Sequence, residues 1–169
     1  MLKYPDEMQE LVLKAAKMSL QTGNVNYILI WLPEESENAM KNLLEKTCCK
    51  RSSRMNMQKQ AYDWYFETVY RFYLSGRSPD HNTTQSRDLT GNQVLKIDRA
   101  IQSGNFEEIR DIIPVTHETD AQQRFQNLIK LRDFPLNNIS AGRSYVSAFF
   151  DFNQYVHNMS SNIISGKDR

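Results

Sequence analysis

The sequence has 169 residues and a mass of 19.8 kDa, with 40% apolar residues, 24% charged residues and a net charge of +1. This apolar content is enough to build a folded core and excludes an intrinsically disordered chain. Because 21 Lys and Arg residues balance 20 Asp and Glu residues, no electrostatic argument favours nucleic acid or a membrane surface as a partner.

From the sequence we expect neither a leader nor a membrane anchor. No apolar stretch follows Lys3, Asp6 and Glu7, so we expect no secretory signal. The longest apolar run, residues 27–32, is far shorter than the roughly 20 residues that cross a bilayer. On these grounds the sequence predicts a cytoplasmic protein with no membrane partner.

Two segments of the chain resemble each other at a constant offset of 81 residues, namely residues 16–33 and 97–114. The identical pairs are Gln21/Gln102, Gly23/Gly104, Asn24/Asn105, Ile28/Ile109 and Pro33/Pro114. The similarity resumes further on with pairs that include Asn56/Asn137 and Trp64/Tyr145. This self-similarity predicts an internal duplication.

Each repeat contains the signals of a helical corner. Gly23 and Gly104 suit the left-handed position that ends a helix, and Asn24 and Asn105 suit the N-cap of the next one. The prolines then end a short second helix. Each half is therefore predicted to contain a helix, a Gly-Asn corner, a short helix, a proline corner, a third helix and a long helix.

The short segment after the corner needs a choice between helix and strand. Residues 27–32 alone are compatible with a buried strand. In the second copy, however, Phe106, Ile109 and Ile113 have helical spacing, with charged residues between them. Because the two halves should share a structure, we predict both segments as helical and the fold as all-α.

The spacing of apolar residues predicts which face of each helix is buried. In the first half the stripes, in chain order, are Met8, Leu11, Val12, Ala15 and Ser19; Val25, Ile28, Trp31 and Leu32; Met40, Leu43, Leu44 and Thr47; and, in the long helix 56–74, Met57, Ala61, Trp64, Thr68 and Phe72. In the second half they are Val94, Ile97 and Ile101; Ala121, Phe125, Leu128 and Ile129; and, in the long helix 138–159, Gly142, Tyr145, Phe149, Phe152, Val156 and Met159.

The predicted domain organisation follows from these elements. Residues 1–76 form the first helical half and residues 91–160 form the second. Residues 77–90, rich in Ser, Thr, Asp and Asn, are a linker, and residues 161–169 are a tail. We expect the halves to pack as one helical bundle, making one compact domain overall.

One long helix carries charges among aromatic residues. Glu67 and Arg71 are four residues apart, which is typical of an ordinary helical ion pair. The alternative is a polar group inside an aromatic cleft between the two long helices, lined also by Trp64, Tyr73 and Tyr145. These five residues are the candidate ligand-binding residues, and no catalytic residue is predicted.

The sequence offers weak signals for a metal site. Cys48 and Cys49 are adjacent and lack the C-x-x-C spacing of redox or metal motifs. The acidic residues after His117 are better explained by a helix start with Thr116 as its N-cap. We therefore predict neither a bound metal nor a cofactor.

Leu29 and Ile30 break the symmetry of the repeat, because the second copy has Arg110 and Asp111 at these positions. Two apolar residues in place of two charges predict a face that is covered in the first half only. Three covers are compatible with the sequence: the N-terminal segment, the opposite half of the chain, or a second chain, as a homodimer contact or a contact with another protein. The alternative is that one of the pair widens the core stripe.

Three strings, S-L-Q-T-G-N-V-N-Y-I-L-I-W, Y-F-E-T-V-Y-R and A-G-R-S-Y-V-S-A, resemble an uncharacterised bacterial family of small exported helical proteins, a domain of unknown function. The resemblance implies an exported or periplasmic location, against the expectation above. It also implies a family pattern of His-Cys-Asp near the N-terminus and a histidine in each long helix. The matching positions here are Tyr4, Pro5, Asp6, Tyr73 and Gln154, so this chain lacks most of those side chains.

Three functions remain open from the sequence. The first is a non-enzymatic helical module for protein interaction or structure, and the second is a small-ligand or cofactor-binding protein that uses the aromatic cleft. The third and weakest is an enzyme with Glu67 as a general base, for which the sequence shows no activating partner.

Overall fold

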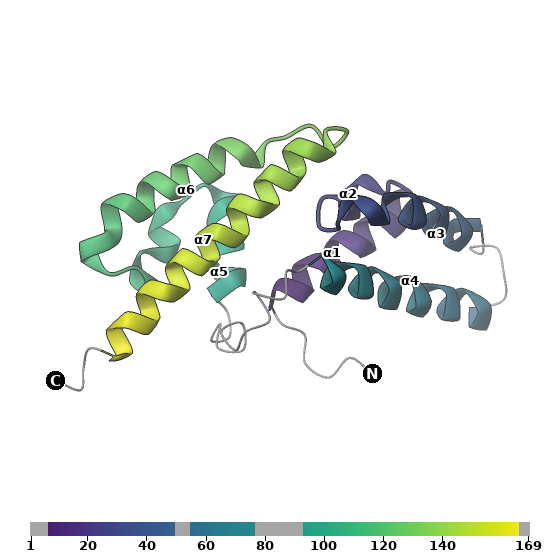
Figure 1. The fold of residues 1–169 in the computed structure, drawn as a ribbon, viewed down its shortest axis with the longest axis horizontal. Coiled ribbons are helices and arrows are strands. Elements are labelled where there is room, and N and C mark those ends of the chain that lie inside the picture. The colour runs from purple at the N-terminus through teal and green to yellow at the C-terminus, as the bar shows by residue number, and fades with distance from the viewer. Residues whose placement is uncertain (1–6, 50–54, 77–92, 166–169) are drawn as a thin grey trace. The chain divides into compact units, whose positions relative to one another are not determined.

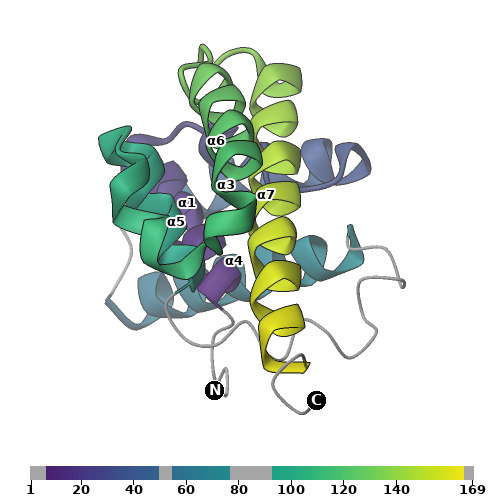
Figure 2. The same ribbon diagram turned by 90° about the vertical axis from the view of Figure 1, so that its left-hand side faces the viewer.

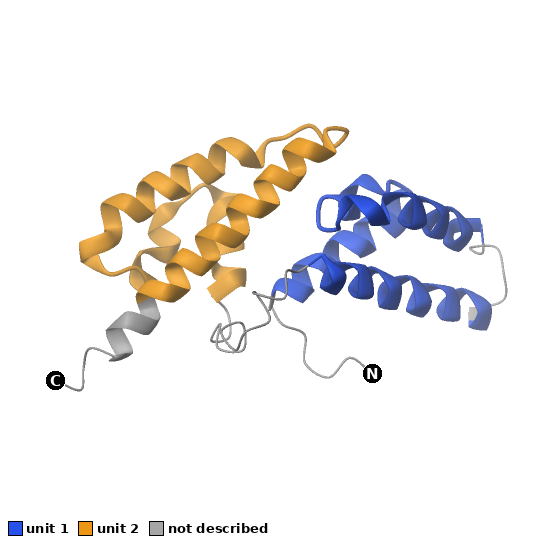
Figure 3. Cartoon of the chain, in the orientation of Figure 1, with its two compact units in different colours: residues 1–86 blue, residues 87–169 orange. Residues whose placement is uncertain are grey.

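The computed structural model describes residues 7–49, 55–76 and 93–165. The chain divides into two compact units, residues 1–86 and 87–169 (Figure 3). Every regular element of the described residues is an α-helix or a 3-10 helix, which confirms the all-α prediction. None of these helices is long and apolar enough to cross a membrane.

Over residues 7–49 and 55–76, the first unit has four α-helices and one short 3-10 helix (Figure 1). They are α1 (Glu7–Thr22), α2 (Asn26–Leu29), η1 (Glu34–Ser36), α3 (Glu37–Cys49) and α4 (Met55–Ser75). Helix α1 packs against α2, α3 and α4, and α3 also packs against α4. The core of this unit therefore lies between α1, α3 and α4.

The second unit repeats this order of elements, with 3-10 geometry in place of the short α-helix. It contains α5 (Gln93–Ser103), η4 (Phe106–Ile112), η5 (Val115–His117), α6 (Glu118–Arg132) and α7 (Ile139–Ser165). Helices α6 and α7 lie side by side, antiparallel, and form the most extensive contact of the unit (Figure 2). Rings of Phe106 and Phe125, 5.5 Å apart between centroids, and of Phe125 and Phe152, 6.1 Å apart, link η4, α6 and α7.

The two corners have the predicted backbone. Gly23 has a φ of 72° and Gly104 a φ of 70°, in the left-handed region that favours glycine at a helix end. The side-chain oxygen of Asn105 accepts a hydrogen bond from the Glu107 N–H at 3.1 Å and caps η4. Asn24 accepts in the same way from the Asn26 N–H at 3.0 Å. Asn105 is therefore the N-cap of η4, as predicted. The predicted N-cap at Asn24 is wrong, because α2 has Val25 at that position and Asn24 bonds from one residue earlier.

Most predicted buried stripes are correct. All four residues predicted for α3 and all six predicted for α7 are buried, as are Val94, Ile97 and Ile101 of α5. In α1, Ala16 is buried where Ala15 was predicted, and α7 extends to Ser165, beyond the predicted end at 159.

The predicted face of α4 is wrong. Its buried residues are Ala61, Tyr65, Val69 and Tyr73, whereas the predicted stripe shares only Ala61 with them. Trp64 is 58% exposed and Met57 52% exposed. The physical reason is the contact with α1, where the Tyr65 hydroxyl meets Ser19 Oγ at 2.6 Å and so fixes the rotation of α4 about its axis.

Candidate functional site

The outer face of α4 is the most conspicuous exposed surface of the described residues. Met57, Gln60, Trp64, Glu67, Arg71 and Leu74 follow one another at intervals of three and four residues, and all six are exposed. They therefore form one continuous line along the helix, called here the α4 stripe. Trp64 and Leu74 are 58% and 43% exposed, which is unusual for side chains of this size.

The charges of the α4 stripe lie between its apolar residues. Arg71 Nη2 lies 3.5 Å from Glu67 Oε1, and the two side chains are 70% and 67% exposed. This is the ordinary helical ion pair that the spacing indicated. A general base works best where water is excluded and a second group orients it, so the exposure of Glu67 gives no support to an enzymatic role.

The five predicted ligand-binding residues do not share one face within a unit. Trp64, Glu67 and Arg71 lie together on the α4 stripe. Tyr73 is 3% exposed and belongs to the core side of α4. Tyr145 belongs to α7 of the second unit, where its ring lies 5.7 Å from that of Phe134 and 6.3 Å from that of Phe149. Burial raises the pKa of Tyr145 to about 12.

Leu29 and Ile30 differ in environment. Leu29 is 0% exposed and lies in the core with Ile28 and Leu32, whereas Ile30 is half-buried. The predicted cover of Leu29 is present within its own unit, where α2 packs against α1, so this side chain offers no surface to a second chain. A partner contact through Ile30 stays a prediction. Leu29 widens the core stripe, as in the alternative interpretation.

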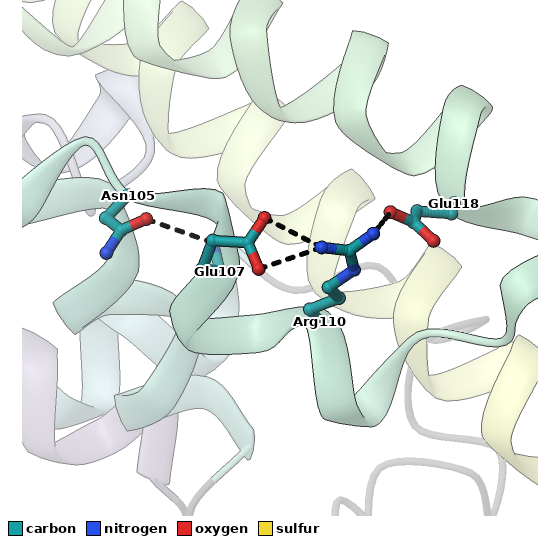
Figure 4. Close-up of polar contacts among 4 residues, drawn as sticks. All are labelled: Asn105, Glu107, Arg110 and Glu118. Atoms are coloured by element: carbon teal, nitrogen blue, oxygen red, sulfur yellow. Dashed lines mark hydrogen bonds and ion pairs between the residues drawn. The ribbon is translucent and has the colours of Figure 1, made fainter.

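The equivalent corner of the second unit carries a surface network instead (Figure 4). Arg110 Nη1 donates to both carboxylate oxygens of Glu107, at 3.1 and 3.0 Å, and Arg110 Nη2 lies 2.6 Å from Glu118 Oε1. These hydrogen bonds, with the charges of the two glutamates, raise the pKa of Arg110. The network joins η4 to the first turn of α6.

A second polar cluster joins α6 to α7. Asp120 accepts hydrogen bonds from the Tyr155 hydroxyl at 2.5 Å and from Arg124 Nε at 3.0 Å, and the Arg124 guanidinium lies 4.3 Å from the centre of the Tyr155 ring. These hydrogen bonds lower the pKa of the Asp120 carboxyl. The cluster is solvent-exposed and internally paired, which is typical of a structural contact between helices.

The first unit has an open depression of about 490 Å³ beside the end of α3. It is lined by Gly23, Val25, Lys41, Leu44, Glu45, Cys48 and Cys49. Both cysteines are free thiols, Cys49 exposed and Cys48 half-exposed. Lys41 also lies 3.5 Å from Glu37, so its charge is already partnered outside the depression. No sequence motif indicated this depression, and none of the predicted ligand-binding residues lines it.

No three His, Cys, Asp or Glu side chains within residues 7–49, 55–76 and 93–165 are placed to hold a metal ion. The predicted N-cap at Thr116 is wrong, because α6 has His117 at its N-cap position and no side-chain hydrogen bond there. Thr116 Oγ1 instead lies 2.9 Å from His117 Nδ1. The predicted acidic first turn is present as Glu118 and Asp120.

Comparison with known proteins identifies a family. Residues 9–155 match the family described as "Family of unknown function (DUF6448)". The chain belongs to this family. No curated protein and no solved structure matches it.

Membership of DUF6448 agrees with the resemblance to a domain of unknown function and assigns no activity. The match contains Tyr73 and Gln154. In this member of DUF6448 the two residues have different environments: Tyr73 is buried, while Gln154 is exposed and donates to Asn158 Oδ1 at 2.9 Å.

Proposed function

We propose that this protein is a non-enzymatic helical module that binds a protein partner through the α4 stripe. The observation that carries the proposal is the exposure of Trp64, 58%, on a helix whose other large aromatic residues are buried or half-buried. Leaving an indole in water forfeits a large hydrophobic gain, and tryptophan is enriched among the residues that dominate protein interfaces.

The surroundings of Trp64 support this role. Met57 and Leu74 extend the exposed apolar surface to both ends of α4. Glu67 and Arg71 lie between them and supply one charge of each sign, which suits a partner with complementary charges. An apolar surface with polar groups at fixed places is the general composition of a protein interface.

Site-specific photo-crosslinking in cells that produce the full chain tests the proposal. A benzophenone amino acid at Met57 or Leu74 should give a discrete protein adduct, and Trp64→Arg in the same chain should abolish it. The matched control is the same probe at Leu131 of α6, which is 40% exposed and outside the α4 stripe. Absence of adducts from both α4 positions, or equal adducts from Leu131, would contradict the proposal.

A further inference from the structure

We propose that the partner of the α4 stripe is a second copy of this chain, with the two α4 helices antiparallel across a two-fold axis at the level of Val69. This inference rests on the proposed function, because it names the partner of the same surface. A closed two-fold pair requires a surface that is complementary to itself. The α4 stripe has that property.

The self-complementarity lies in the order of residues along the stripe. Trp64, Glu67, Arg71 and Leu74 give the order apolar, acidic, basic, apolar, all exposed. When a second α4 runs in the opposite direction about residue 69, each position i faces position 138 − i of the other copy. Trp64 then faces Leu74, and Glu67 faces Arg71, in both directions.

The charges also exclude the parallel arrangement. Two α4 helices in parallel register would place Glu67 against Glu67 and Arg71 against Arg71, and such like-charge contacts disfavour association. The antiparallel pair instead forms two Glu67–Arg71 contacts between copies. With apolar contacts at both ends and opposite charges between them, the antiparallel orientation satisfies the four stripe positions from Trp64 to Leu74.

The Glu67–Arg71 ion pair within each helix does not prevent the contacts between the two copies. Its separation of 3.5 Å is long for an ion pair, and both side chains remain more than two-thirds in water. Exposed pairs of this kind contribute little to stability, so the two side chains can turn to a second copy at small cost. In the pair, each carboxylate keeps its own arginine nearby and gains a second one.

The contact is short and therefore weak. Residues 64–74 span about 15 Å of helix, at 1.5 Å per residue, and such a contact buries less than the roughly 1,200–2,000 Å² of a standard stable interface. Half-buried Tyr70 adds some area beside Leu74. We therefore expect a reversible dimer whose population depends on protein concentration. The population should fall at high salt, because salt screens the charge pairs between the copies.

Sedimentation of the full chain over a concentration series tests the inference by charge reversal. The wild type should approach twice the 19.8 kDa chain mass as concentration rises. Glu67→Arg and Arg71→Glu should each weaken the dimer at least tenfold, because each puts like charges across the two-fold axis. An equimolar mixture of these two variants should dimerise again, since one chain then carries two positive and the other two negative charges.

The matched control is Lys41→Glu, which removes another i, i+4 pair of the first unit and should leave the dimer unchanged. Circular dichroism should show unaltered helicity in every variant, since the three substituted residues are exposed and ion-paired at the surface. A wild type that stays monomeric at every concentration, or a dimer indifferent to both reversals, would overturn the inference. If the crosslinking experiment gives an adduct with a different protein while the chain is monomeric, the proposed function stands and this inference fails.

Discussion

The Tyr65 hydroxyl lies 2.6 Å from Ser19 Oγ and ties α4 to α1 inside the first unit. Ser19 Oγ donates its own proton to the Ala16 carbonyl at 2.6 Å, so in this pair the tyrosine is the donor and the serine the acceptor. Both residues are 0% exposed. Because the tyrosine donates and the serine accepts, removal of one hydroxyl should affect stability differently from removal of the other.

Removing the acceptor should therefore cost more than removing the donor. Ser19→Ala leaves the buried Tyr65 O–H without its acceptor, at an expected cost of about 1–3 kcal/mol in the free energy of unfolding. Tyr65→Phe removes the donor while Ser19 keeps its bond to Ala16, and should cost about 1 kcal/mol. Urea unfolding of both variants gives the comparison, and an equal or reversed order would contradict this assignment of the proton.

The two buried tyrosines predict a loss of stability at alkaline pH. Burial raises the pKa of Tyr65 and of Tyr145 from 10.0 to about 12. The unfolded chain thus releases these protons at a lower pH than the folded chain, so their stabilising contribution is complete below pH 10 and is lost as pH rises through 12. Each shift of two units corresponds to roughly 2–3 kcal/mol.

Urea unfolding at pH 9, 10 and 11, followed by circular dichroism, measures this loss. The double variant Tyr65→Phe/Tyr145→Phe should show a flatter dependence of stability on pH than the wild type, whatever its stability at neutral pH. Identical slopes would show that other groups control the alkaline transition.

A substitution at Gly23 tests the left-handed backbone conformation of the first corner without a change in side-chain packing. A Cβ at this position would have no neighbouring atom within 4 Å, so the cost of Gly23→Ala arises only from the φ of 72°. We expect a loss of about 1–2 kcal/mol in thermal or urea unfolding. Gly23→Asn should lose less, because asparagine tolerates the left-handed region better than alanine. Equal losses for the two variants would show that φ is not the cause.

The sequence predicted the order of helices well because the corner signals are local. Glycine, asparagine and proline act through the backbone of their immediate neighbours, and the equivalent boundaries are again 81 residues apart: α1 and α5 end at 22 and 103, and α3 and α6 begin at 37 and 118. A shared order of elements supports the predicted duplication, which remains a prediction about how the chain arose.

The rotation of α4 could not be predicted in this way. Aromatic residues occur on all sides of this helix, so periodicity alone fits several faces. The face is set by the contact between Tyr65 and Ser19, which are 46 residues apart in the chain. The same contact leaves Trp64, one residue earlier, exposed. The most informative surface of the protein thus depends on a non-local contact that sequence periodicity does not report.

Leu29 and Arg110 show a similar limit, because they occupy matching places in the repeat and opposite environments. Apolar character at position 29 was compatible with a core residue and with a docking surface, and only burial separates the two. An exchange of side-chain type, with arginine at position 29 and leucine at position 110, therefore tests the difference in burial.

Leu29→Arg should unfold the first unit rather than alter its association. The side chain is 0% exposed, and a buried charge without a partner typically costs more than 3 kcal/mol. Arg110→Leu should leave the second unit folded, since Arg110 is half-exposed on a surface network and Glu107 and Glu118 can return to water. The two tryptophans of the chain, Trp31 and Trp64, both belong to the first unit, so fluorescence reports on that unit selectively. Leu29→Arg should shift the emission to that of an unfolded chain at a much lower urea concentration than the wild type does. For Arg110→Leu, circular dichroism, which reports on both units, should show the helicity of the wild type. A Leu29→Arg variant with wild-type unfolding and a lower sedimenting mass would instead restore Leu29 as a contact residue between chains.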